Sequence, residues 1–332
     1  TSIPAAFKNG QRVLFDPRGV IRTVNLNAAI EPEAVTVSGL ADYTIAGSGS
    51  LAGAMWLDKM GEGTLVLKGN HSYSGITDNW EGTLKITDTL THSHVKVRRH
   101  AVLELSGKAG NGISTEYNAR IYPGGKNQAG EMKVKGNLSI VEGARLIFDL
   151  SQTPEGLNDK VIVAGMLTLA NAAIIQLQLT EQKLTPGSYA LALVDGFTGD
   201  VSKLKIEGIT GTASELIYNE AEKTLYLVVK GVRAASTISW TGAKNASWDL
   251  ASTANWSKDG LEEIFVGNDT VVFPQASTNR SINIAETLNP LHTIVSSTLP
   301  YVFDGSGKLT GAMTLQKLNS GTLTINNRNE FT

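Results

Sequence analysis

Two histidines beside a basic run are the first candidates for chemistry in this sequence. His92 and His94 are two residues apart, so on a strand both side chains would leave the same face, within reach of one metal ion. No carboxylate or thiol follows at ligand spacing, and Lys96 and Arg98 add positive charge that opposes a bound cation. We therefore expect a solvated outer face here and assign no metal ligand.

The basic run suits an anionic sugar better than a metal. The guanidinium groups of Arg98 and Arg99 match carboxylates bidentately, so they could contact an acidic glycan or supply the base of a β-helix polysaccharide lyase. A lyase also needs acidic residues that hold a charge-neutralising cation. The nearest acids, Asp88 and Glu104, are single and widely spaced. We expect surface charge that protects a sheet edge, and we assign no catalytic residue and no cofactor.

Tryptophan is the other residue type with a possible ligand. An indole face stacks on a pyranose ring, so Trp56 and Trp80 are candidate glycan contacts; the alternative is that both cover neighbouring strands. Trp240, Trp248 and Trp256 follow at intervals of eight residues. They would form either a glycan platform or, as we favour, a cap or core at the end of a repeated structure.

One acidic loop and the overall composition complete the search. Asp195 and Asp200 flank glycines but lack the ligand spacing of a calcium loop, so a turn between strands is expected. The net charge is −2 and charged residues make up 18%, which argues against nucleic acid as a partner. Cysteine is absent, which excludes disulfides and thiolate sites. No apolar run is long enough to span a bilayer, so no transmembrane segment is expected.

A long internal repeat underlies these candidates. Residues 1–74 align without a gap to residues 259–332, and 21 of the 74 pairs are identical. Glycines, small residues and alternating aliphatics repeat, whereas reactive side chains do not; Trp56, for example, aligns with Thr314. This is the signature of a repeated scaffold. Met55 and Met313 occupy the same position of a repeated Gly-Ala-Met triplet, and we expect both to be buried.

Short strands with two-residue apolar alternation account for most of the chain. Gly-Thr-Leu begins at residues 63, 82 and 321, and the 19-residue spacing of the first two fits one coil of a parallel β-solenoid. An antiparallel sandwich would use similar strands. We predict an all-β fold, a parallel β-helix or β-solenoid, with a less regular, β-sandwich-like segment near 181–230.

The repeat also predicts the domain organisation. We expect a solenoid module at 1–232 that lacks its first 20 or so residues, and the start of a second copy at 233–332. The second copy opens with the tryptophan-rich stretch and stops in mid-repeat, so we expect the chain to be part of a longer polypeptide.

The order of these elements resembles the autotransporter-associated β-strand repeat of bacterial secreted and surface proteins. The resemblance rests on Gly63–Gly75, on the second Gly-Thr-Leu strand at Gly82–Ile86 and on Gly187–Leu191, with His100 where the family usually has glycine. It covers most of the chain, including the tryptophan-rich opening. It implies an elongated extracellular or cell-surface solenoid, commonly part of an adhesin or a polysaccharide-processing protein, and it carries no catalytic residues.

Two hypotheses follow. The first is a non-catalytic, repeated β-solenoid scaffold or stalk of an extracellular bacterial protein, with an adhesive role or contact to a polysaccharide or host glycan. In that case the glycan contacts would be Trp56, Trp80, Arg98 and Arg99. The second is a lyase-type β-helix, or the glycan-targeting region of a carbohydrate-active enzyme.

Overall fold

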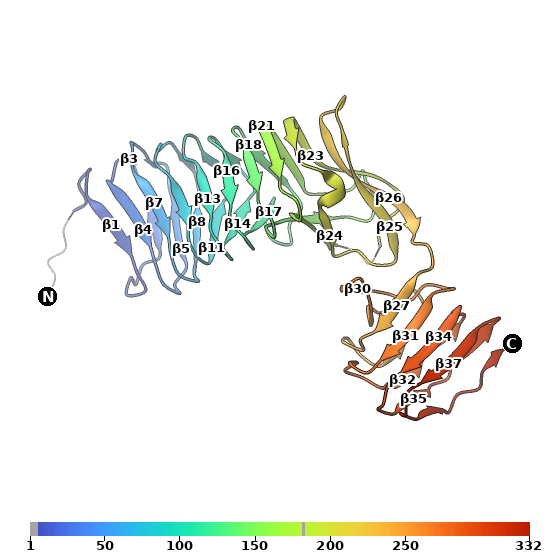
Figure 1. Ribbon diagram of the computed structural model, residues 1–332. Helices are drawn as coiled ribbons and strands as arrows, with labels where there is room; N and C mark the ends of the chain where they lie inside the picture. The colour runs from blue at the N-terminus through green and yellow to red at the C-terminus, as the bar shows by residue number, and fades with distance from the viewer. Residues whose placement is uncertain (1–5, 181–182) are drawn as a thin grey trace. The chain divides into compact units, whose positions relative to one another are not determined.

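The computed structural model describes residues 6–180 and 183–332. In that part of the chain the regular elements are short β-strands, apart from one 3₁₀ turn, η1 (Val201–Lys203). Most strands pair in parallel with strands one coil away, so the predicted all-β solenoid is confirmed (Figure 1). Residues 1–5 and 181–182, which belong to the expected regions 1–232 and 181–230, lie outside the described residues. None of the described helices has the length and hydrophobicity to cross a membrane.

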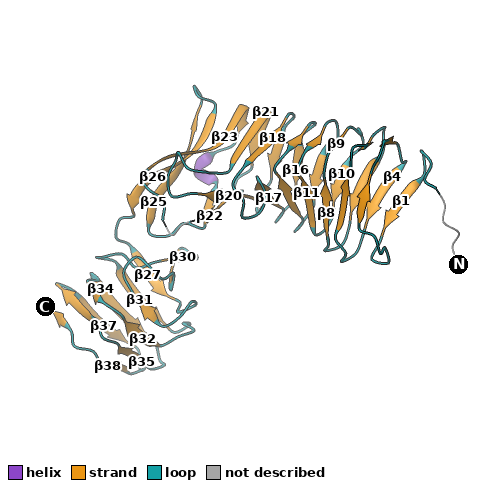
Figure 2. Ribbon diagram, turned by 180° about the vertical axis from the view of Figure 1, so that it is seen from behind, coloured by secondary structure: helices purple, strands orange, loops and turns teal. Residues whose placement is uncertain are grey.

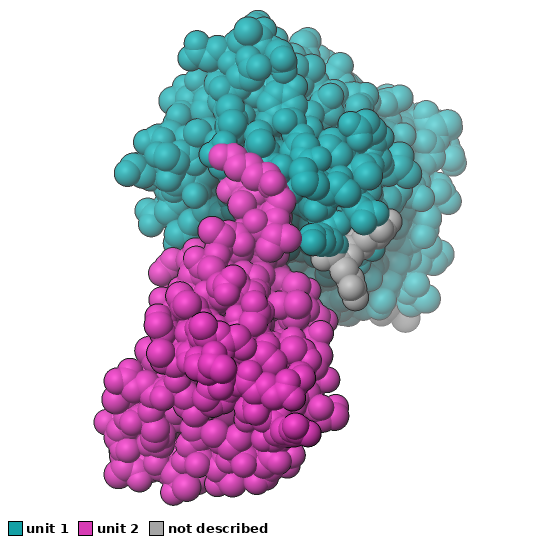
Figure 3. Space-filling view, turned by 90° about the vertical axis from the view of Figure 1, so that its right-hand side faces the viewer, with its two compact units in different colours: residues 1–208, 215–229 teal, residues 209–214, 230–332 magenta. Residues whose placement is uncertain are grey.

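The chain forms two compact units (Figure 3). Unit 1 comprises Thr1–Gly208 and Glu215–Val229, and unit 2 comprises Ile209–Ser214 and Lys230–Thr332. The chain therefore enters unit 2 briefly, returns to unit 1, and enters unit 2 again at Lys230.

Unit 1 is built from three parallel ladders, and each coil contributes one strand to each ladder (Figures 1 and 2). The first ladder contains, in order, β1 (Arg12–Phe15), β4 (Ala34–Val37), β7 (Trp56–Lys59), β10 (Thr77–Asn79), β13 (Val95–Val97), β16 (Ile113–Thr115), β19 (Leu138–Ile140) and β21 (Lys160–Leu169). The second contains β2 (Thr23–Asn25), β5 (Tyr43–Ala46), β8 (Thr64–Leu67), β11 (Thr83–Ile86), β14 (Val102–Leu105), β17 (Arg120–Pro123), β20 (Arg145–Leu150), β22 (Ile174–Leu179) and β24 (Lys205–Glu207). The third side consists of β3 (Ala29–Ile30), β6 (Ser50–Leu51), β9 (Asn70–His71), β12 (Thr89–Leu90), β15 (Lys108–Ala109) and β18 (Glu131–Val134).

The two-residue alternation of the sequence separates side chains that face the solenoid core from side chains that face outward. In β8 and β11 the leucines and the isoleucine are buried, while the alternate residues, Thr64, Val66, Thr83 and Lys85, are half-buried. Thr64 of β8 pairs with Thr83 of β11, so the 19-residue spacing of the Gly-Thr-Leu motifs is one coil. Stacked coils therefore bury a continuous apolar core and satisfy their backbone groups through each other.

The coil corners explain some of the glycines. Gly82 has φ +65°, and a Cβ there would lie 2.5 Å from the carbonyl oxygen of Gly61 in the preceding coil. Only glycine avoids both the strain and the collision. His100, which stands where the resembled family has glycine, adopts φ 65°, so the corner keeps the left-handed conformation that glycine favours.

The less regular segment near 181–230 contains both parallel and antiparallel pairing. The long strand β21 joins the first and third sides, because its beginning pairs with β18 and its end with β19. β23 (Gly187–Thr198) continues in parallel on β21, and β24 continues in parallel on β22. The change of direction comes at β26 (Thr224–Val232), which pairs antiparallel with β23 and also pairs with β25 (Thr212–Asn219).

Unit 2 is a shorter solenoid with an added turn at its start. One ladder contains β27 (Thr237–Trp240), β31 (Thr270–Pro274), β34 (His292–Ser296) and β37 (Thr314–Leu318). A second contains β28 (Ser247–Trp248), β32 (Ser281–Ile284), β35 (Tyr301–Asp304) and β38 (Leu323–Ile325), and a third contains β33 (Thr287–Leu288), β36 (Lys308–Gly311) and β39 (Glu330–Phe331). β29 (Trp256–Lys258) pairs antiparallel with β27, and β30 (Leu261–Glu263) pairs antiparallel with β29.

The internal repeat is present in the structure, strand for strand. Arg12 pairs with Ala34 in unit 1, and their counterparts 258 positions later, Thr270 and His292, pair in unit 2. The next strand pair of this ladder has its equivalent in unit 2 at the same offset of 258 residues. The strand pairs of the other two ladders do as well. Met55 and Met313 are 1% and 4% exposed, as predicted.

Candidate functional site

The outer face of the first ladder in unit 1 carries most of the side chains that the sequence singled out. In register, Asp58 of β7 pairs with Asp78 of β10, which pairs with Lys96 of β13. The residues on either side of Lys96, Val95 and Val97, are fully buried, so this row points outward. Residues two positions further along each strand form the next outward row, and that row brings Trp80 beside Arg98.

Arg98 is the centre of a compact group of charges on this face. Its Nε and Nη2 donate to Asp78 Oδ1 and Oδ2 at 2.7 and 2.6 Å, and its Nη1 donates to Glu116 Oε1 at 2.7 Å. Its guanidinium carbon lies 4.3 Å from the centroid of the Trp80 ring. The indole Nε1 of Trp80 in turn donates to Asp58 Oδ1 at 3.3 Å. We call these five residues the Arg98 cluster.

The positive charge of Arg98 is satisfied within the cluster. Its hydrogen bonds to Asp78 and then to Glu116 raise the pKa of the Arg98 guanidinium above its already high ordinary value. The hydrogen bond from Arg98 lowers the pKa of the Glu116 carboxyl. Arg98 therefore makes the bidentate fork predicted for a sugar carboxylate, but with Asp78 of its own chain. One face of the Trp80 ring is occupied by the same guanidinium.

Of the two remaining glycan candidates, Arg99 borders this cluster and Trp56 lies apart from it. The Arg99 guanidinium lies 5.4 Å from the ring centroid of Tyr117, and its backbone N–H donates to Glu116 Oε2 at 3.2 Å. Trp56 lies under Arg12, at 5.5 Å from the ring centroid. The register places Trp56 four residues along the strand direction from Trp80, or about 13 Å. The two indoles are 38% and 42% exposed.

The two histidines are held by different coils. His92 Nδ1 lies 3.2 Å from the carbonyl oxygen of Ser72, whereas His94 Nε2 lies 2.8 Å from Ser114 Oγ. The rings are thus engaged with the preceding and the following coil. Across the described residues, no group of three or more His, Cys, Asp or Glu side chains is arranged to hold a metal ion.

The three tryptophans of unit 2 form a core. Trp240, Trp248 and Trp256 are each no more than 1% exposed, and their ring centroids lie 5.2 to 5.8 Å from that of Phe273. The cap-or-core interpretation is confirmed, and the glycan platform is wrong because no indole face reaches solvent. The turn expected over Asp195–Asp200 is confirmed only at its end: Asp195 lies within β23, whereas Asp200 begins the connection to β24 and caps η1 by accepting from the Ser202 backbone N–H at 3.0 Å.

Sequence reasoning missed a lysine that clamps a coil corner. Lys59 is 1% exposed, and its ammonium donates to the carbonyl oxygens of Gly61 and Glu81 at 2.6 and 2.9 Å. Burial lowers its pKa to about 8, so it remains largely protonated at neutral pH. Its counterpart Lys317 donates to Leu318 and Asn319 at 2.7 and 2.9 Å. The sequence signal that could have revealed this role is that the lysine is identical in both copies of the repeat.

A buried carboxyl pair was also missed. Asp149 and Asp159 are 3% and 0% exposed. Asp159 Oδ1 accepts from the Gly130 backbone N–H, and Oδ2 accepts from that of Asp149, both at 2.7 Å. Burial raises the pKa of Asp159 to about 8 and also raises that of Asp149. These acids fix the loop before β18 and are out of reach of a substrate carboxylate.

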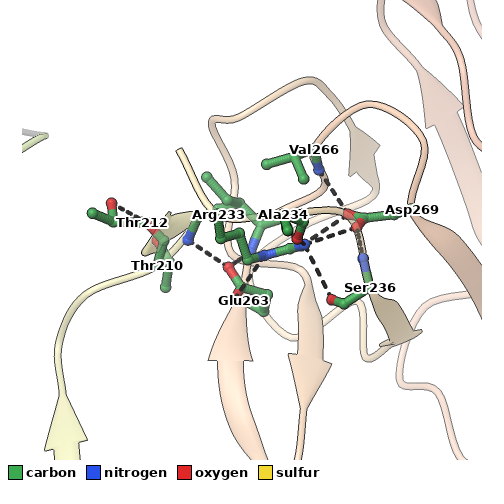
Figure 4. Close-up of polar contacts among 10 residues, drawn as sticks. Thr210, Thr212, Arg233, Ala234, Ser236, Glu263, Val266 and Asp269 are labelled. Atoms are coloured by element: carbon green, nitrogen blue, oxygen red, sulfur yellow. Dashed lines mark hydrogen bonds and ion pairs between the residues drawn. The ribbon is translucent and has the colours of Figure 1, made fainter. Parts of the chain in front are cut away.

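A third group holds the start of unit 2 together (Figure 4). Arg233 donates bidentately to the fully buried Asp269, at 2.7 and 2.8 Å, and lies 3.1 Å from Glu263. Glu263 accepts from the Gly211 backbone N–H at 2.6 Å, and Asp269 accepts from that of Ser236 at 2.8 Å. The ions are paired and their remaining oxygens accept backbone hydrogen bonds, as a structural ion group requires.

The geometry leaves two kinds of surface on unit 1: a self-paired charged face and two half-exposed indoles. Comparison with known proteins adds no assignment, since no protein-family model matches this chain and no curated protein matches its sequence.

Proposed function

We propose that this chain is a non-catalytic scaffold or stalk of an extracellular bacterial protein. The Arg98 cluster is the observation that carries the proposal. The side chains best suited to acidic-sugar chemistry are hydrogen-bonded to one another across adjacent coils, so they hold the coils in register. The resemblance to secreted passenger repeats supports the extracellular location. Antibody labelling of intact and permeabilised producing cells tests it: label confined to permeabilised cells contradicts the proposal.

The lyase alternative has a direct test. β-Elimination of an acidic polysaccharide produces an unsaturated sugar, which is followed by ultraviolet absorbance. We expect no turnover by this chain on pectic or uronate-rich substrates. Turnover that is lost in Arg98→Ala but kept in Arg12→Ala would replace the scaffold by an enzyme. Arg12 is the matched control because it also pairs with a glutamate and lies over a tryptophan.

Glycan contact is the second candidate function, and the exposed indoles favour it. Trp56 and Trp80 each keep more than a third of their surface open to solvent. A sugar would stack on the face that the neighbouring arginine leaves free. Titration with pectic and host-type glycans, followed by tryptophan fluorescence, tests this role. The three buried tryptophans of unit 2 give a constant background. A shift that survives Trp56→Ala combined with Trp80→Ala would exclude both residues.

A further inference from the structure

The first coil of unit 1 leaves its apolar end open among the described residues. A hollow of about 360 Å³ lies at this end of the core. Phe7 is 39% exposed, and Val13, Phe15, Val24 and Ile30 are only half-buried. The four half-buried side chains pair in register with Val35, Val37, Ile45 and Leu51 of the next coil, which are all buried.

The repeat shows what this surface looks like when it is covered. The counterparts of the same five residues, 258 positions later, are at most 1% exposed in unit 2. They are Phe265, Val271, Phe273, Ile282 and Leu288. Since the residue types and strand registers match, the difference in burial comes from what lies against them.

The covering segment in unit 2 is residues 237–258, here named the Trp segment. Its indoles pack on the open end: Trp248 lies 5.6 Å from Phe265 and 5.2 Å from Phe273 between ring centroids. Its backbone adds a strand to two ladders, because β27 pairs with β31 and β28 pairs with β32. The segment therefore supplies both apolar cover and hydrogen-bonding strand edges.

The open end of unit 1 has the same two features that the Trp segment contacts in unit 2: an apolar surface and the edges of two ladders. β1 pairs with β4 and β2 pairs with β5, and among the described residues neither has a strand on its other side. An open strand edge beside an unfilled apolar end is a surface for β-strand addition. The five apolar residues at this end of unit 1 occupy the positions whose counterparts in unit 2 are covered by the Trp segment.

We propose that the open end of unit 1 binds a polypeptide segment of the same chemistry as the Trp segment. The bound segment adds strands to the edges of β1 and β2 and places indoles over Phe7 and Phe15. This binding should be weaker than the equivalent contact in unit 2. Gln11 stands where unit 2 has Asp269, so unit 1 cannot form an ion pair equivalent to that between Asp269 and Arg233. This binding is independent of any glycan contact at Trp56 or Trp80.

The test uses the full chain and a synthetic peptide of residues 237–258 that carries 5-fluorotryptophan at position 248. Fluorine NMR then observes the peptide without interference from the chain's own indoles. We expect saturable binding with a new, shifted resonance, and displacement of a hydrophobic dye from the chain. A peptide with Ser in place of all three tryptophans should not bind.

Two chain variants locate the site. Phe7→Ser should weaken peptide binding at least tenfold, because Phe7 is the counterpart of Phe265. Leu157→Ser removes a side chain that is 84% exposed elsewhere in unit 1, and it should leave the affinity unchanged. Absence of binding at millimolar peptide, or equal binding by the two variants, would overturn the proposal. Self-association of the chain that Phe7→Ser abolishes would also overturn it, by assigning the end to a second copy.

Discussion

At the scale of single residues, the arginines of unit 1 differ in how many partners they hold. Arg98 serves two carboxylates and one indole and is one quarter exposed. Arg12 pairs with one carboxylate, Glu33, and these two side chains are 68% and 44% exposed. Exposed pairs contribute little to stability, whereas removing the cation of a shared, partly buried group leaves carboxylates facing each other.

Replacing Arg98 by Met should therefore lower the free energy of unfolding by about 1–3 kcal/mol, because Asp78 and Glu116 lose their common donor. Urea denaturation followed by far-ultraviolet circular dichroism measures the change. Arg12→Met is the matched control and should have a clearly smaller effect. Equal effects of the two substitutions would show that the Arg98 cluster adds nothing to the stacking of the coils.

Asp159 predicts a pH dependence of stability. Its pKa is raised from 3.8 to about 8 in the folded protein, so the folded state binds a proton more tightly than the unfolded state. Its contribution is fully present below about pH 4 and is lost as the pH rises toward 8. Asp159→Asn should remove this decline in the free energy of unfolding.

The control for this experiment is Asp88→Asn. Asp88 accepts a hydrogen bond from the Gly69 backbone N–H, which lowers its pKa, so its own contribution is lost as the pH falls. That variant should keep the decline between pH 4 and 8. A stability curve that is the same in wild type and Asp159→Asn would contradict the assignment.

At the scale of the element, the strands were predictable and the corners were not. Alternation and the Gly-Thr-Leu spacing identify strands and coil length because both are local in sequence. The partners of Arg98 were missed because they lie 20 residues before it and 18 after it. Residues at those separations can be recognised as neighbours only when the length of each coil is known. Lys59 was missed because a lysine on an alternating strand normally faces water, whereas this one turns into the corner and meets carbonyl oxygens.

The two equivalent lysines make this corner testable. Lys59→Met removes the donor to two carbonyl groups, including that of Glu81 in the next coil, and should destabilise the corner by about 2–4 kcal/mol. Lys317→Met should cost less, because Lys317 is only half-buried and donates to the carbonyl oxygens of Leu318 and Asn319, which are exposed residues. Hydrogen exchange measured by mass spectrometry at each corner gives the comparison. A larger effect at Lys317 would contradict the clamp.

At the scale of the whole molecule, the repeat predicted more than the alternation did. The gapless alignment fixed which strands correspond, and their registers match throughout. The fusion of two ladders on β21 and the antiparallel strand β26 were beyond sequence reasoning. Both depend on where a ladder ends, and strand patterns are the same for parallel and antiparallel neighbours.

Stacked coils also predict a gradient of local stability in unit 1. Each coil is stabilised by its neighbours, so a coil with one neighbour should open more easily than a coil with two. β1 pairs only with β4 among the described strands, whereas β11 lies between β8 and β14. Amides of β1 should therefore exchange with solvent deuterium at least a hundredfold faster than those of β11.

Unit 2 provides the control for this gradient within the same sample. β31 is the counterpart of β1 and pairs with β34 in the same register, but it also has β27 on its other side. If the missing neighbour is the cause, β31 should be protected more strongly than β1, although the two strands have the same inward-facing valine and phenylalanine. Residue-resolved exchange by NMR measures both strands at once. Equal protection of β1 and β31 would mean that strand sequence sets local stability. It would also remove the reason to expect that covering the open end of unit 1 stabilises it.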